Sequence, residues 1–145
     1  MKRKYKVVVF ALVIGFAFAI SAPMTLAKDL TKKDLVEQAR SKITEISVEE
    51  AKAQLDKGGA IFMDCREPRE YKQGHIPGAI NIPRGLLEFK IAKVAPDKTT
   101  KIVMYCRSGG RASLACCSLE PMGYKNVVSI RGGWLAWTKA GYPVE

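Results

Sequence analysis

The chain of 145 residues contains little of what a metal site needs. It has one histidine, His75, and four cysteines, and no Cys-x2-Cys pair lies near that histidine. Structural zinc sites are usually built from four Cys and His ligands at close spacing. We therefore expect no bound metal, and nothing else in the sequence indicates a cofactor.

Aromatic residues are also few, at 8% of the chain, although the formal net charge is +10. No cluster of Lys and Arg is interleaved with aromatic residues, as a surface that stacks bases would require. The hydrophobic fraction of 48% and the charged fraction of 26% are typical of a globular domain. We interpret the positive charge as a solvated surface and expect no nucleic-acid partner.

Only one long apolar run is present, and it lies near the N-terminus. It covers the 14 residues from Val7 to Ile20, fewer than the roughly 20 that span a membrane. Basic residues precede it, and Thr25-Leu26-Ala27 places small residues where signal peptidase reads them for a cut after Ala27. Residues 1–27 are therefore predicted to be a signal peptide. The protein would then be exported, to the periplasm, and would touch a membrane only if this segment stayed uncleaved.

The rest of the chain alternates apolar runs with helical patterns. Residues 28–42 are predicted to be a helical extension with Thr31 as a possible N-cap, and residues 43–145 to be one domain. Strands are expected at 43–46, 60–64, 79–82, 101–105 and 127–130, and helices at 47–57, 67–73, 86–94, 111–119 and 134–140. Strands separated by helices predict an α/β fold with a parallel sheet.

The turn after the expected strand 101–105 carries the strongest chemical signal. It contains Cys106, Arg107, Ser108, Gly109, Gly110 and Arg111, and it leads into a helix. Such a turn directs backbone N–H groups and the positive end of the helix dipole at one point. A cysteine there is stabilised as the thiolate, which is the nucleophilic form. We predict Cys106 as the catalytic nucleophile and the five residues after it as the substrate-binding loop.

This loop resembles the active-site loop of the rhodanese family. Three further stretches agree with that family in order: Asp64-Cys65-Arg66-Glu67 with Glu70-Tyr71, Gly74 to Pro83, and Gly123-Tyr124 through Gly132-Gly133-Trp134 to Trp137. The resemblance implies a single rhodanese-like α/β domain whose five-stranded parallel sheet is flanked by helices. It also implies sulfur transfer, in which Cys106 takes sulfur from thiosulfate or a similar donor and passes the persulfide sulfur to a thiol or cyanide.

Two other functions stay open at this point. The chain could be a sulfur carrier or a partner of a thiol-redox protein that holds a persulfide without small-molecule turnover, or a catalytically idle interaction domain. Phosphatase activity is disfavoured by loop length. Related phosphatases resemble this loop but have five residues between the cysteine and the arginine, whereas four separate Cys106 from Arg111 here.

Several other side chains are expected to support the site. Arg66 is expected to pair with a carboxylate near the site, with Asp64 as a second supporting residue. His75 is expected to be structural. Cys65 is either a small buried side chain or the partner of Cys106 in an inactivating disulfide. On the later helices, one of Cys116 and Cys117 is expected to face the core, and Trp134 and Trp137 to pack on the sheet.

Overall fold

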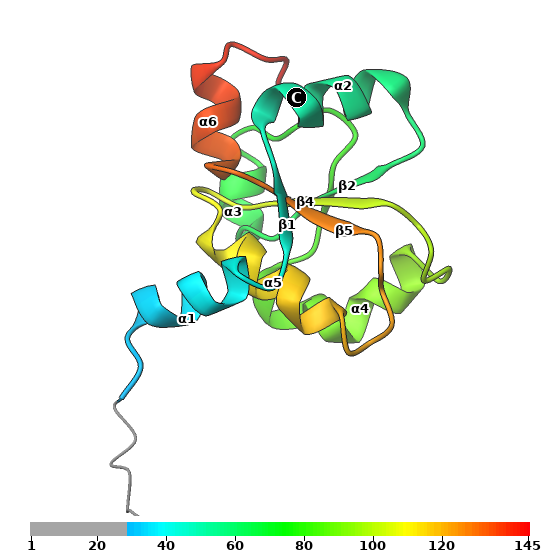
Figure 1. Ribbon diagram of the computed structural model, residues 1–145. Coiled ribbons are helices and arrows are strands. Elements are labelled where there is room, and N and C mark those ends of the chain that lie inside the picture. Colours follow the sequence, from blue (N-terminus) through cyan, green and yellow to red (C-terminus); the bar gives the residue numbers. More distant parts are fainter. Residues whose placement is uncertain (1–28) are drawn as a thin grey trace, which may run out of the picture.

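The computed structural model describes residues 29–145 (Figure 1). The predicted signal peptide, residues 1–27, lies outside the described residues. Within the described part, no helix is long and apolar enough to cross a membrane.

Five parallel strands form one sheet in the order β1-β5-β4-β2-β3. The strands are β1 (Thr44–Ile46), β2 (Ile61–Asp64), β3 (Ile80–Asn81), β4 (Ile102–Tyr105) and β5 (Val127–Ile130). The predicted five-stranded parallel sheet is thereby confirmed. All four residues of β4 are buried, as expected for a central strand that is covered on both faces.

Six α-helices surround the sheet in the described chain (Figure 1). They are α1 (Lys32–Arg40), α2 (Val48–Lys57), α3 (Pro68–Tyr71), α4 (Leu87–Val94), α5 (Gly110–Leu119) and α6 (Gly133–Lys139), with a short 3-10 turn at Arg84–Leu86. The Thr31 N-cap of α1 and the Ser47–Glu50 capping box of α2 are both present. The helix expected at 67–73 is shorter, because only Pro68–Tyr71 is helical.

The sheet separates two hydrophobic clusters. One contains Met63, Cys65, Met104 and Cys106 together with residues of α4 and α5. The other contains Phe62, Val103 and Tyr105 together with residues of α2 and α6. Alternate residues of β2 and β4 therefore face opposite sides of the sheet, and this alternation decides which side chains can meet at the carboxyl end of the strands.

Candidate active site

Cys106 lies directly beyond the carboxyl end of the central strand β4, and α5 begins four residues later. This is the edge of a parallel sheet at which ligands usually bind. Gly109 turns the chain into the helix with φ +95°, a left-handed conformation that glycine adopts without steric cost. The structure therefore gives the strand–turn–helix arrangement that the sequence predicted around Cys106.

A cavity of about 260 Å³ opens at Cys106. Its walls include five of the six predicted loop residues, and Gly109 is the exception. The lining residues are Lys32, Val36, Cys106, Arg107, Ser108, Gly110, Arg111 and Leu114. Only 1% of Cys106 is exposed, and the cavity that it lines is bordered by the positive charges of Lys32, Arg107 and Arg111.

The pKa of Cys106 is lowered to about 5, far below that of an ordinary thiol. The largest cause is a hydrogen bond with the side chain of Cys65, and the backbone N–H groups of Ala112, Ser108 and Gly109 contribute further. Burial opposes the shift, since it disfavours the charged form. Cys106 is therefore a thiolate at neutral pH, poised as a nucleophile.

Cys65 is the opposite member of this pair. The hydrogen bond to Cys106 and, after it, burial hold the pKa of the Cys65 thiol well above its usual range, so that Cys65 keeps its proton and donates it. Both cysteines are free thiols in this structure. The thiolate was predicted from the backbone N–H groups of the loop and the helix dipole, whereas the largest contribution comes from Cys65. The sequence does contain a sign that the two cysteines lie close together, because Cys65 and Cys106 each directly follow a strand.

Arg111 is held in place by Glu70, which lies at the end of α3. The two Nη atoms of Arg111 each donate to a different carboxylate oxygen at 2.8 Å. This ion pair holds the pKa of Glu70 at about 2, well below its usual value, and raises that of Arg111. Arg111 thus lines the cavity in a fixed orientation, with its charge partly balanced by Glu70.

Arg66 pairs with Asp64, as the sequence predicted. The pair is buried, with Nη2 2.6 Å from the Asp64 Oδ2, and Nη2 also donates to the carbonyl of Gly74. The guanidinium lies 4.6 Å from the centroid of the Trp134 ring, a cation–π distance. Arg66 and Asp64 therefore form a rigid support beside the site and do not line the cavity at Cys106.

Trp137 is fully buried in the core, whereas Trp134 has two roles. Besides packing against the core cluster of α2 and α6, Trp134 lines a second cavity with Arg66, Glu70, Gln73, Arg107 and Leu135. The expectation that both tryptophans pack on the sheet agrees with these contacts, and lining the second cavity is an additional role of Trp134. Spacing along a helix does not show where that helix ends relative to a neighbouring loop.

The start of α6 is hydrogen-bonded to the backbone of the Cys106 loop. Trp134 N–H donates to the Cys106 carbonyl at 2.8 Å, and Leu135 N–H donates to that of Arg107 at 3.0 Å. Gly133, the residue before Trp134, has φ +56°, and a Cβ there would collide with the Cys106 carbonyl oxygen. In the sequence Gly133 stood out only as part of a stretch that resembles the family, whereas this close approach makes it part of the site's architecture.

His75 has structural contacts. Its ring stacks on Tyr71 at a centroid distance of 3.7 Å, and its backbone exchanges two hydrogen bonds of 2.9 Å with Glu145. It lines neither the Cys106 cavity nor the one beside Trp134. The expectation of a structural role agrees with these contacts.

The helix α1 was predicted as an N-terminal extension, and the structure shows which part of the domain it contacts. It packs against α5, and it brings Lys32 and Val36 to the cavity at Cys106. Arg40 from the end of α1 lies close to Gly109. The segment before the domain therefore forms one wall of the site.

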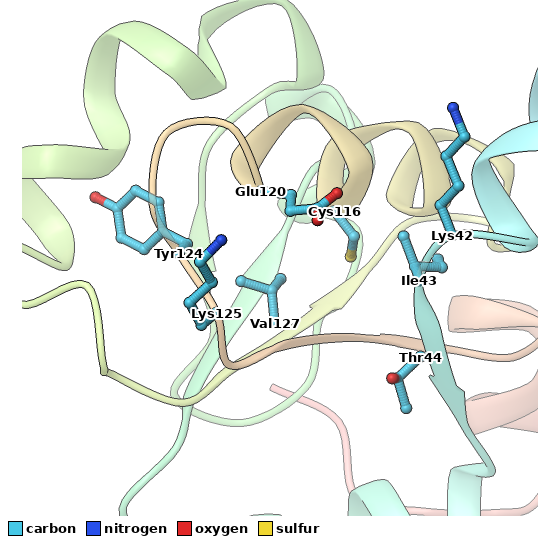
Figure 2. Close-up of a pocket in the computed structure, with 8 residues that line it drawn as sticks. All are labelled: Lys42, Ile43, Thr44, Cys116, Glu120, Tyr124, Lys125 and Val127. Atoms are coloured by element: carbon cyan, nitrogen blue, oxygen red, sulfur yellow. The ribbon is translucent and has the colours of Figure 1, made fainter.

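A separate hollow lies at the opposite end of the sheet. Figure 2 shows it between Ile43 and Thr44 on one side and Tyr124 and Lys125 on the other, with Cys116 facing inward. Cys116 is buried and Cys117 half-buried, so one of the two faces the core as expected. No residue of the Cys106 loop lines this hollow.

Comparison with known proteins gives one consistent result. The model of the rhodanese-like domain matches residues 47–140. A sulfurtransferase of Allochromatium vinosum is 36% identical over 103 residues, which cover 70% of this chain and 94% of that protein. Residues 47–140, which the family model matches, include the whole Cys106 loop, whereas α1 precedes them.

Two solved structures share the fold at similar identity. A protein of unknown function from Rhodopseudomonas palustris, described as a possible tyrosine phosphatase, superposes with a TM-score of 0.75 at 33% identity and covers 85% of this chain and 98% of its own. A thiosulfate sulfurtransferase of Pseudomonas aeruginosa superposes with a TM-score of 0.70 at 30% identity, over 79% of this chain and 22% of that longer one.

Proposed function

The chain belongs to the rhodanese-like sulfurtransferase family, and we propose that it moves sulfane sulfur from thiosulfate or a similar anionic donor to a thiophilic acceptor. The observation that carries this proposal is the state of Cys106. A buried thiolate with a pKa of about 5 lies at the base of a small cavity with positively charged walls. Such a site suits attack on a small dianion, because the thiolate reacts and the surrounding charge attracts the donor.

In the first half-reaction the Cys106 thiolate attacks the outer sulfur of thiosulfate. A bond forms between Sγ and that sulfur, the bond to the sulfonate sulfur breaks, and sulfite leaves with the electron pair. The product is a Cys106 persulfide anion. The backbone N–H groups of Ser108, Gly109 and Ala112, which stabilise the thiolate, are the donors that would hold the negative charge on the outer sulfur.

In the second half-reaction an acceptor such as a thiol or cyanide attacks the outer sulfur and restores the thiolate. Arg107 and Arg111 line the cavity on the way to Cys106, and both can orient an anionic donor. Ser108 and Gly110 complete the loop around the reacting sulfur. We assign no cofactor to either step, because the chemistry needs only the thiolate, charge and backbone donors.

A phosphatase reaction is the competing use of a cysteine–arginine loop. Only four residues separate Cys106 from Arg111, whereas the related phosphatases have five between their cysteine and arginine. A tetrahedral phosphate would need that wider loop. Transfer of a single sulfur atom fits this geometry better.

The place of action is also part of the proposal. The basic start, the 14-residue apolar run and the small residues before Lys28 favour a cleaved signal peptide and a periplasmic location. In an oxidising compartment Cys106 must be kept reduced or persulfidated. A thiol-redox protein is therefore the partner we expect there.

The test is thiocyanate production from thiosulfate and cyanide. Wild-type protein should turn over, Cys106→Ser should be inactive, and Cys117→Ser should match the wild type because Cys117 lies outside the site. Turnover by Cys106→Ser at the wild-type rate would contradict the proposal. A protein that takes one sulfur onto Cys106 but yields no thiocyanate would be a sulfur carrier.

A further inference from the structure

Cys65 and Cys106 occupy corresponding positions at the ends of adjacent parallel strands. Asp64 of β2 is in register with Tyr105 of β4, and Cys65 N–H donates to the Tyr105 carbonyl at 2.9 Å. Cys65 and Cys106 are the next residues along. Neighbouring strands lie about 4.8 Å apart, which falls within the Cα separation of about 4.4–6.8 Å that a disulfide spans.

The two side chains also lie on the same face of the sheet. Met63, Cys65, Met104 and Cys106 share one core cluster, whereas Phe62, Val103 and Tyr105 share the other. Cys65 is fully buried and Cys106 almost so, and both belong to this one cluster. Each of the two side chains is the largest cause of the pKa shift of the other, which is consistent with this placement.

We propose that Cys65 is a resolving cysteine that attacks the Cys106 persulfide and releases its outer sulfur as hydrosulfide. This inference rests on the proposed function, since it requires the persulfide. A disulfide forms between Cys65 Sγ and Cys106 Sγ, and the bond from Cys106 Sγ to the outer sulfur breaks. The Cys65 proton goes to the departing sulfur, which leaves as HS⁻. The persulfide's sulfane sulfur is reduced and the two cysteine sulfurs are oxidised, so no external oxidant is needed.

Formation of the persulfide itself prepares Cys65 for this step. In the resting site the Cys106 anion, which accepts the hydrogen bond from Cys65, is the main reason why Cys65 keeps its proton. Once Cys106 Sγ is bonded to a second sulfur, the negative charge resides on the outer atom, where loop N–H groups can hold it. Cys65 then loses that restraint and faces an electrophilic Sγ from the neighbouring strand.

The cycle closes with a dithiol reductant. Thiol–disulfide exchange at Cys106, the cysteine that lines the open cavity, returns both thiols and oxidises the dithiol. The net reaction converts thiosulfate and a dithiol into sulfite, hydrosulfide and a disulfide. Cys65 would thus direct sulfur to hydrosulfide whenever no acceptor reaches the outer sulfur first.

A single-turnover experiment tests this step. Fully reduced protein, freed of small thiols, is mixed with thiosulfate without oxygen or acceptor, and sulfite, sulfide and intact mass are followed. Wild-type protein should release one sulfite and one sulfide per chain and end two hydrogens lighter, with Cys65 linked to Cys106. Cys65→Ser keeps a side-chain donor for the Cys106 thiolate but cannot form a disulfide, so it should release sulfite, keep one added sulfur atom and release no sulfide.

Cys116→Ala is the matched control, because Cys116 is a buried thiol of the same cluster that opens on the hollow of Figure 2. It should release sulfide as the wild type does, at a rate that is independent of protein concentration. A wild-type protein that keeps its persulfide and releases no sulfide would overturn the inference and leave the proposed function standing. Sulfide release by both Cys65→Ser and Cys65→Ala at the wild-type rate would also overturn it. Absence of sulfite from every variant would overturn the proposed function itself.

Discussion

Glu70 and Arg111, which are 41 residues apart in the chain, form a two-point ion pair with both N···O distances at 2.8 Å. The pair joins α3 to the first turn of α5 at the edge of the Cys106 cavity. Side chains with exposed fractions of 35% and 26% gain little stability from such a contact, because solvent screens it. Its main effect is to orient Arg111.

We predict that Arg111→Ala raises KM for thiosulfate roughly 10- to 100-fold, since a hydrogen bond to a charged group contributes about 1.5–3 kcal/mol. Arg111→Lys should recover only part of this loss, because lysine lacks the planar fork. Glu70→Gln should have a smaller effect of the same sign. Steady-state kinetics provide the measurement, with the exposed Arg69→Ala as control. A KM for Arg111→Ala equal to that of the wild type would show that Arg111 does not bind the donor.

The pH dependence of the first half-reaction should follow the Cys106 thiolate. Its pKa is lowered to about 5, so the thiolate is fully formed at neutral pH and is lost as the pH falls through about 5. The rate of sulfite release at low thiosulfate should therefore be flat from pH 7 to 9 and decline below pH 6. A rate that instead rises up to pH 9, as for an ordinary thiol, would refute the stabilised thiolate.

Lys32 tests whether α1 belongs to the site. It lines the Cys106 cavity yet is exposed, so its ammonium acts on a bound anion through a screened field. Lys32→Ala should raise KM for thiosulfate a few-fold with little change in Tm. Lys57→Ala, at the end of α2, removes the same charge elsewhere and should leave KM unchanged. Equal effects of the two variants would mean that only net charge matters.

Gly133→Ala should distort the loop that holds Cys106. An alanine Cβ would collide with the Cys106 carbonyl oxygen, and φ is +56°, so both contact and conformation oppose it. Overpacking of this kind costs about 1–3 kcal/mol, and activity should fall with Tm. Gly141→Ala is the control, because Gly141 has φ +71° but nothing within 4 Å. Thermal unfolding should show a larger decrease in Tm for Gly133→Ala than for Gly141→Ala. Equal decreases would show that the close approach at Gly133 does not matter.

Much of the fold could be predicted from the sequence because buried parallel strands are short, continuous apolar runs. Ile102 to Tyr105 is an example, and Val127 to Ile130 departs from this pattern only at Ser129. The Cys106 loop was also predictable, since its glycines, arginines and following helix are contiguous in the chain. Local sequence is sufficient wherever a feature is made of neighbouring residues.

The contacts between distant segments were not predictable in the same way. The capping residue Thr31 indicates a helix but not that its Lys32 and Val36 reach a cavity some seventy-five residues away. The strength of the Cys65–Cys106 contact depends on the register of β2 and β4. The close approach of Gly133 to the Cys106 carbonyl oxygen depends on how α6 packs against the Cys106 loop. Each of these is fixed by tertiary packing, which a single sequence does not display.

The most direct test of the account is the mass of the Cys106 peptide in Cys65→Ser protein after treatment with thiosulfate. We predict a gain of one sulfur atom on that peptide alone, with an equimolar release of sulfite. An unchanged Cys106 peptide and no sulfite, in protein whose folding is confirmed by its Tm, would contradict sulfur transfer through Cys106.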